Sequence, residues 1–294
     1  MEQPLARKGG FQAALQAVGT LCVALLLLAS GFLACVLPPT AKTLALQTAQ
    51  PDARTAFTVN DLANVADATR DYSFGSHDRA SLVHAIAVAN HNAQERGKAT
   101  GKAQIGAPNL DGVDINDQQQ VEAAFAHATE RYVYSDDAIS HLDDCYSVAM
   151  RAYALVAAAL ILAVSSLAAM RSRVGAARAL TRAGTGIVAL FAVAGIWAAI
   201  DFDGLFTVFH ELFFSQGNWT FASDSLLICA LPTEFWVGMG AVWLTTSTIA
   251  SILSILVGKS LTKPRGARQA STNRRNNTAA CFGLRLSTTE RESS

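Results

Sequence analysis

Four long blocks of apolar residues punctuate the chain and predict its architecture. Each is close to the roughly 20 helical residues that cross a hydrocarbon core of about 30 Å. The 294 residues are 51% hydrophobic and only 16% charged, against about a quarter charged in soluble domains. The pattern therefore predicts an all-α, polytopic membrane protein with four transmembrane helices. We place these helices at 11–37, 146–170, 183–200 and 235–258.

The formal net charge is zero, but the charges are segregated along the chain. Basic residues gather before the first block, between the second and third, and after the fourth, where acidic residues are almost absent. The positive-inside rule assigns such segments to the cytoplasm. We therefore predict a plasma-membrane protein with both termini inside and a C-terminal tail that, being basic and poor in apolar residues, is disordered. The cytoplasmic segments are 1–10, a loop at 171–182 and the tail 259–294. The extracellular segments are the cap 38–145 and an aromatic loop at 201–234.

The first block has an alternative interpretation as a cleaved signal peptide. Basic residues precede it, and Leu33, Ala34 and Cys35 faintly resemble a lipoprotein cleavage site. Phe32 and Leu33 suit such a site poorly, however, and the apolar run of about 27 residues exceeds the 7–15 of a signal peptide. A retained anchor is therefore the favoured interpretation.

The long extracellular segment is predicted to be a mostly helical cap. Its polar–apolar spacing indicates three amphipathic helices, two of which begin at residues that favour helix N-termini. It has few large apolar residues for its length, so we expect it to lie on the membrane rather than to fold alone. The helices are expected at 58–72, at 76–96 and from Asp117, with a loop at 97–116. The next helix is expected to begin near Ser135 and to continue into the second block.

The five cysteines show no metal-binding spacing and no CxxC motif. Cys145 and Cys229 both fall near the outer face and are able to pair in principle, although buried free cysteines are ordinary. The sequence also lacks a glycine-rich phosphate loop, HExxH and GxSxG. We therefore expect no metal and no cofactor.

Three of the six histidines are spaced by seven residues in the cap, at His77, His84 and His91. This spacing is compatible with a stripe of metal ligands on one helix. No tight pair at i and i+4 accompanies them, so a solvent-exposed face is the favoured interpretation.

His141 and His210 differ from these, because the predicted topology places both at the outer membrane interface. Each has acidic neighbours, with Asp144 one turn after His141 and Glu211 beside His210. Histidine exchanges protons near neutral pH, so two of them at one depth suit an acid and a base. A pair of interfacial histidines that bind lipid headgroups remains the alternative.

The stretch 202–219 surrounds His210 with phenylalanines and ends in a tryptophan. Aromatic residues also collect at membrane interfaces simply as anchors, so the enclosure alone does not indicate a site. Arg151 is the one charged residue within the four apolar blocks. It either serves the site or extends its long side chain to the headgroups.

Four short stretches together resemble one protein family. In residue type, order and predicted side of the membrane they are similar to the bacterial lipoprotein intramolecular transacylases, as are the four spans and the extracellular cap. The resemblance covers about 130–240 well and the rest in outline, while Cys145, the stretch 97–116 and the long tail depart from the family pattern. The stretches are SHLDD at 140–144, FTVFHELFF at 206–214 followed by Asn218 and Trp219, DSLLI at 224–228, and PTEF at 232–235.

The resemblance implies an acyl transfer within one molecule. The sn-2 acyl chain of a diacylglyceryl lipoprotein moves to the α-amine of its N-terminal cysteine and leaves a lyso-form lipoprotein. His141 and His210 are the implied catalytic acid and base, in an order that the residues do not decide. The implied partners are the lipid-modified N-terminus of bacterial lipoproteins and membrane lipid, with no nucleic acid, and the oligomeric state stays open. The implied supporting residues are Asp144, Arg151, Asn218, Phe206, Phe209, Phe213, Phe214 and Trp219.

The alternative function is that of a non-enzymatic membrane protein. It would be a sensor whose cap binds a ligand, or an assembly partner. Such a protein is expected to keep its function when either histidine is replaced.

Overall fold

The computed structural model describes residues 3–101, 103–214 and 217–262. Within these ranges the chain forms ten helices and no strand, which confirms the all-α prediction. The helices are α1 (Gln3–Cys35), α2 (Pro38–Thr48), α3 (Val59–Phe74), α4 (Arg79–Thr100), α5 (Gln118–Phe125), α6 (Asp136–Ala169), α7 (Arg173–Ile200), α8 (Phe202–Phe213), α9 (Leu226–Ala230) and α10 (Thr233–Thr262).

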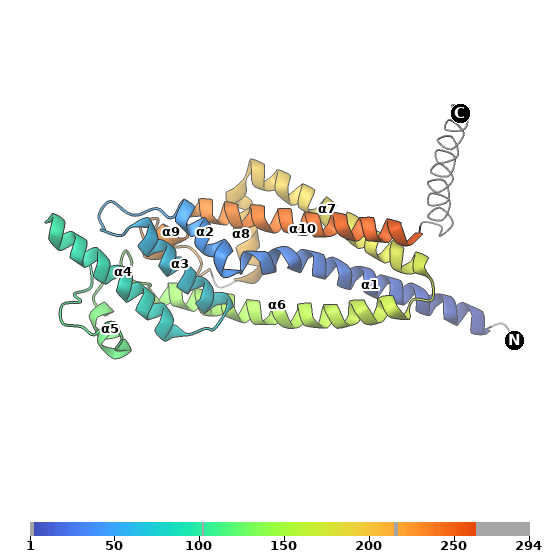
Figure 1. Cartoon of the computed structure of the whole chain (residues 1–294), viewed down its shortest axis with the longest axis horizontal. Helices are drawn as coiled ribbons and strands as arrows, with labels where there is room; N and C mark the ends of the chain where they lie inside the picture. The colour runs from blue at the N-terminus through green and yellow to red at the C-terminus, as the bar shows by residue number, and fades with distance from the viewer. Residues whose placement is uncertain (1–2, 102, 215–216, 263–294) are drawn as a thin grey trace, which may run out of the picture.

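Four of these helices, α1, α6, α7 and α10, are long and apolar enough to cross a membrane. They run along the long axis of the molecule, and the shorter cap helices α2 to α5 and α9 gather at one end (Figure 1). The start of α1 and the end of α10 lie at the opposite end. The chain is therefore a multi-pass membrane protein, as predicted. Leucine, isoleucine and valine side chains are exposed along the long helices, as lipid-facing surfaces require.

Helix α1 is the centre of the bundle, because it packs against each of the other three long helices. Its buried residues Cys22, Val23 and Leu27 share a core with Ala159 of α6 and Ile187 of α7. Helices α7 and α10 also pack closely against each other, whereas α6 packs mainly on α1 among the long helices.

Small residues allow the backbones of these helices to approach closely, as is common between membrane helices. A side chain at Gly31 of α1 would meet the indole and carbonyl of Trp243 and the hydroxyl of Ser247, both on α10. The Trp243 indole also donates a hydrogen bond of 2.8 Å to the carbonyl of Leu28. Further along α10, the backbone carbonyl of Ser251 faces Gly184 of α7.

Several predicted helix starts in the cap are confirmed. Thr58 forms a capping box with Asp61, each side chain bonding the backbone N–H of the other residue, at the start of α3. Asp117 caps α5 by accepting from the N–H groups of residues 119 and 120. Ser135 caps α6, which continues without a break into the second apolar block.

The second cap helix differs from its prediction at both ends. Asp78, rather than Ser76, caps α4, because the Ser76 hydroxyl donates to the carboxylate of Asp71. The helix extends to Thr100 and ends at Gly101, whose φ of +64° suits glycine. The predicted loop 97–116 is therefore wrong for its first four residues.

Two further predictions of irregular structure are wrong. The stretch 201–234 contains α8 and α9, and the expected loop 171–182 is helical from Arg173 onward. Helix α1 ends shortly before Pro38, and Pro38 begins α2, since proline is tolerated in the first turn of a helix. Of the tail predicted to be disordered, 259–262 belongs to α10, and 263–294 lies outside the described residues.

Most of the buried residues of the cap share a core with the end of the bundle. Leu62 of α3 and Leu82 of α4 lie in one cluster with Leu226 of α9 and Phe235 of α10, while α4 and α5 form a smaller cluster of their own. Tyr132, fully buried just before α6, lies in the same cluster. The cap is thus packed onto the end of the bundle, and its position relative to the long helices is fixed by shared apolar contacts.

The contact at Gly31 predicts a large effect of a single substitution. Gly31→Leu should lower the free energy of unfolding by about 1–3 kcal/mol, the usual cost of overpacking a tight contact. Gly240→Leu is the matched control on α10, because nothing lies within 4 Å of a side chain added there. Thermal unfolding in detergent micelles measures both. Equal midpoints for the two variants would show that α1 and α10 do not approach as described.

Candidate active site

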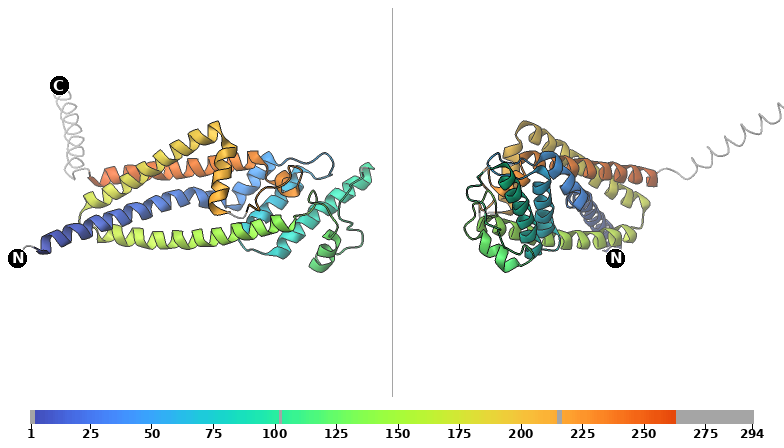
Figure 2. Two further views of the ribbon diagram at one scale, coloured as in Figure 1. Left: turned by 180° about the vertical axis from the view of Figure 1, so that it is seen from behind. Right: turned by 60° about the vertical axis from the view of Figure 1, so that its left-hand side comes forward.

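The two histidines singled out from the sequence meet in the structure. His141 lies in the second turn of α6 and His210 in the last turn of α8. Their ring centroids are 6.1 Å apart, and the ring planes differ by 31°. Helix α8 runs across the bundle toward α6 (Figure 2, left view), and this crossing brings them together. Only 8% of His141 and 7% of His210 is exposed.

The hydrogen bond of His210 defines its neutral form. Nδ1 of the ring lies 2.8 Å from the backbone carbonyl of Phe206, one helical turn earlier. A carbonyl oxygen only accepts, so Nδ1 is the nitrogen that carries the proton. Nε2 of a neutral His210 therefore keeps a free lone pair. Burial lowers the pKa of His210 below its ordinary 6.5, against the smaller opposite effect of the Phe206 hydrogen bond, so the ring is neutral at pH 7.

His141 has one ring nitrogen without a partner. Its Nε2 lies 3.6 Å from the sulfur of Cys145, one turn along α6. Its Nδ1 is buried and makes no hydrogen bond to the described residues. A buried, unpaired ring nitrogen is costly in a fold. Such a group is a common feature of sites whose partner is a bound substrate atom.

Aromatic rings enclose the pair. His210 contacts Phe206 at a centroid distance of 3.9 Å, Trp219 at 5.0 Å and Phe209 at 5.6 Å. Phe214 contacts both histidines, at 4.7 Å from His141 and 5.7 Å from His210. These rings, which come from α8 and the segment after it, place the imidazoles in an apolar setting.

Phe213 is also part of the predicted enclosure but lies one layer further out. It contacts Phe209 and Phe214 and has no ring contact with either histidine among the described residues. Its side chain is about half exposed, on the outward face of α8.

Asp144 and Asn218 are paired with each other. The amide Nδ2 of Asn218 donates to the carboxylate of Asp144 at 3.1 Å and to the hydroxyl of Ser140 at 3.4 Å. The Asp144 carboxylate thus accepts from Asn218, and no hydrogen bond from His141 to it is found in the described residues. Asn218 Oδ1 is buried without a partner there. This pair joins the segment after α8 to the start of α6.

Arg151 stands apart from this cluster. It is exposed on α6 and forms no hydrogen bond or ion pair with the described residues. Ten residues of helix separate it from His141, which corresponds to about 15 Å along the axis. The grouping of Arg151 with the site therefore gains no support from a contact.

His77 contradicts the prediction of a solvent-exposed histidine face, which His84 and His91 fit. Its ring is stacked between Tyr72, at 4.3 Å, and Tyr146 of α6, at 3.9 Å. Its Nε2 lies 3.7 Å from Asp143, which also accepts a hydrogen bond of 2.6 Å from the Tyr72 hydroxyl. His77 precedes α4 rather than lying on it, which is why its helical spacing to His84 is misleading.

Sequence reasoning missed three residues of the site, two of which contact His141 and one of which contacts Phe206. Phe221 contacts His141 at 5.9 Å, and Trp236 of α10 contacts Phe206 at 5.9 Å. The third is Cys145, which the sequence indicates only as a possible disulfide partner. It and Cys229 are both free thiols in the structure. The one available signal is position, since Cys145 is four residues after His141 and shares its helical face.

Comparisons with known proteins agree with this architecture. The family model described as lipoprotein intramolecular transacylase Lit matches residues 116–236. The solved structure of the membrane integral lipoprotein intramolecular transacylase Lit from Bacillus cereus superposes with a TM-score of 0.53 at 17% identity, covering 86% of this chain and 96% of that one. A second structure of that protein, with a histidine-to-arginine mutation, gives a TM-score of 0.55 at 16% identity, covering 90% and 97%. No curated protein sequence matches the chain. At these identities the two structures establish the fold.

The His210 hydrogen bond generates a test by nitrogen NMR. In ¹⁵N-histidine-labelled protein in micelles, the His210 signals, assigned by their loss in His210→Ala, should report a neutral ring with the proton on Nδ1 at pH 7. Because burial lowers its pKa, the ring should take up its second proton only below pH 6.5. A charged ring at pH 7, or the tautomer protonated on Nε2, would contradict the described geometry.

Proposed function

We propose that this chain is a lipoprotein intramolecular transacylase, a proposal supported by the match of its residues 116–236 to the model of that family. The chain transfers the sn-2 acyl group of a diacylglyceryl lipoprotein to the α-amine of the N-terminal cysteine of the same molecule. The product is a lyso-form lipoprotein. The observation that carries this proposal is the buried pair His141 and His210, 6.1 Å apart within an aromatic enclosure.

The bond changes define what the site must supply. The amine nitrogen bonds to the ester carbonyl carbon, and the bond from that carbon to the glyceryl oxygen breaks. One proton leaves the nitrogen, and one proton goes to the departing alkoxide. The reaction therefore needs a base and an acid near neutral pH, which is the range in which histidine works. It needs no cofactor.

His210 is suited to be the base. Its Nδ1 proton is held by the Phe206 carbonyl, so Nε2 is the nitrogen left to accept the amine proton. The α-amine has an ordinary pKa of about 7.7–8.0, which a neutral imidazole near pH 7 matches well. Burial keeps the ring uncharged and ready to take up that proton.

His141 is the remaining candidate for the acid that protonates the glyceryl oxygen. It faces the same enclosure, and its Nδ1 has no partner among the described residues. The proton that His210 takes from the amine passes to His141, and His141 passes a proton on to the glyceryl oxygen. Both rings then end with the protons with which they began.

The aromatic enclosure supports transfer over hydrolysis. Phe206, Phe214 and Trp219 surround the rings, and excluding water protects an ester whose competing reaction is hydrolysis. The amine and the ester belong to one molecule, so holding both in contact supplies orientation that a free reaction lacks. Asn218, bonded to Asp144, presents an amide beside this space.

The segregated charges support the membrane orientation of the site. With both termini cytoplasmic, the cap and the histidine pair lie at the outer face of the plasma membrane. The partner is then the lipid-modified N-terminus of a lipoprotein whose acyl chains are already in the outer leaflet. This sidedness is part of the proposal.

Replacing either histidine tests the proposed chemistry. His141→Ala and His210→Ala should each reduce conversion of diacylglyceryl to lyso-form lipoprotein by about 100-fold or more, the usual scale for losing a general acid or base. Mass spectrometry of lipoprotein N-terminal peptides, from cells that lack other N-acylation, measures the product. The fragment ions also identify which ester position lost its acyl chain.

His91→Ala is the matched control, since His91 is exposed on α4 and should leave conversion unchanged. Well-expressed wild-type protein that leaves the lipid forms unaltered would refute the transacylase assignment. Wild-type conversion by both histidine variants would instead refute only their catalytic roles.

A further inference from the structure

The segment between α8 and α9 forms one wall of the histidine site. It contributes Trp219 and Phe221 to the ring contacts, and Asn218 to the bond with Asp144. Few backbone hydrogen bonds stabilise this segment from within. In its described part they are Gly217 N–H to Phe214 and Ser225 N–H to Ala222. The position of this segment must therefore be fixed by contacts with other parts of the chain.

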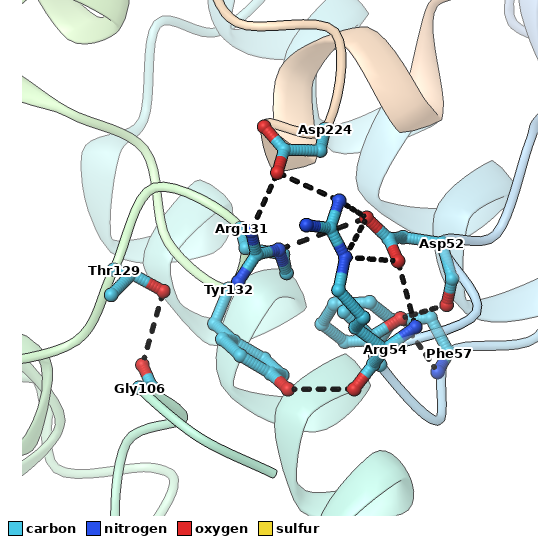
Figure 3. A network of polar contacts seen from close by, with 9 residues as sticks. Asp52, Arg54, Phe57, Gly106, Thr129, Arg131, Tyr132 and Asp224 are labelled. Carbon is cyan, nitrogen blue, oxygen red and sulfur yellow. Dashed lines mark hydrogen bonds and ion pairs between the residues drawn. The ribbon is translucent and has the colours of Figure 1, made fainter.

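One end of the segment is fixed by α8, and the other end is fixed by ion pairs. The Asp224 carboxylate accepts from Nη2 of Arg131 at 2.5 Å and from Nη2 of Arg54 at 2.8 Å (Figure 3). Asp52 completes a network of four charges. It pairs with Arg54 at 2.7 Å and lies 3.7 Å from Nε of Arg131. We call these four residues the Asp224 network.

The network joins three parts of the chain that are distant in sequence. Asp52 and Arg54 lie between α2 and α3, Arg131 lies between α5 and α6, and Asp224 directly precedes α9. Backbone bonds reinforce the same junction. Leu226 N–H donates to the Glu130 carbonyl at 2.8 Å. The cap therefore holds the C-terminal end of the wall segment.

Three members of this network are at least partly buried, whereas the Arg54 side chain is 60% exposed. The Asp52 side chain is only 10% exposed, and those of Arg131 and Asp224 are 24% and 32% exposed. Each carboxylate faces two guanidinium groups, so the charges balance. Arg54 holds the pKa of Asp52 at about 2, and Arg131 lowers the pKa of Asp224. Removing one partly buried member of the network leaves the charges of its partners uncompensated.

We propose that the Asp224 network positions Asn218 and Trp219 against the two histidines, so that Asp224 and Arg131 are positioning residues of the acyl transfer. The effect on the reaction rate rests on the proposed function, whereas the positioning of the two side chains does not. Only four residues lie between Trp219 and Asp224, so a displacement of the anchored end acts on Trp219 through a short span of chain. A shift of about 1 Å at a reacting group can cost two orders of magnitude in rate.

The test compares variants of the full chain purified in micelles, with a synthetic diacylglyceryl lipopeptide as substrate. Asp224→Asn and Arg131→Gln should lower kcat about 10- to 100-fold while KM and the folded fraction change little. Asp224→Glu, which keeps the charge, should recover most of the rate. Arg79→Gln removes the exposed cap pair of Arg79 with Glu122 and is the matched control, with unchanged kcat.

A spectroscopic measurement separates this inference from the proposed function. With 5-fluorotryptophan incorporated, the ¹⁹F signal of Trp219, assigned by its loss in Trp219→Phe, should shift in Asp224→Asn and not in Arg79→Gln. If the Trp219 signal shifts in Asp224→Asn but the wild-type protein is inactive, the proposed function is refuted while the positioning role of the network stands. An unshifted signal, or a rate loss no larger than the loss of folded protein, would overturn the positioning role.

Discussion

The change of direction at Asp201 is the constraint on which the candidate site depends. Its N–H still bonds back to the carbonyl of Trp197 at the end of α7, and its carboxylate caps α8 by accepting from Gly204 N–H at 2.8 Å. A side chain at residue 204 would meet that carboxylate, so glycine there is part of the turn. If α7 continued straight, His210 would be carried away from α6. One capped turn therefore converts a membrane span into a helix that crosses the bundle.

The sequence predicts much of this architecture because membrane insertion acts on local patterns. Long apolar blocks predict α1, α6, α7 and α10, and cap residues such as Thr58 and Ser135 identify helix starts. Charge segregation also predicts that His141 and His210 lie at one membrane depth. Their contact through α8 is beyond prediction, because aromatic residues at an interface are expected in loops and helices alike.

What the sequence could not predict are partners set by tertiary packing. Spacing alone places Asp144 where it could orient His141, but its carboxylate accepts from Asn218, which arrives from a segment 74 residues away. Phe221 and Trp236 reach the site from different elements, and the stacking of His77 on Tyr146 needs the cap to dock on α6. These contacts have long sequence separations, for which neither periodicity nor capping carries a signal.

The central position of α1 also affects when the helix bundle can be completed. This helix is synthesised first. Its Leu28 carbonyl nevertheless accepts a hydrogen bond from the Trp243 indole, 215 positions later in the chain. Each new span must find α1 in the bilayer as it leaves the ribosome, and the last to do so is α10. A chain stalled before that point holds both histidines but lacks the helix against which α8 rests. The wall of the site that α10 provides is therefore in place only after the last long helix has been inserted.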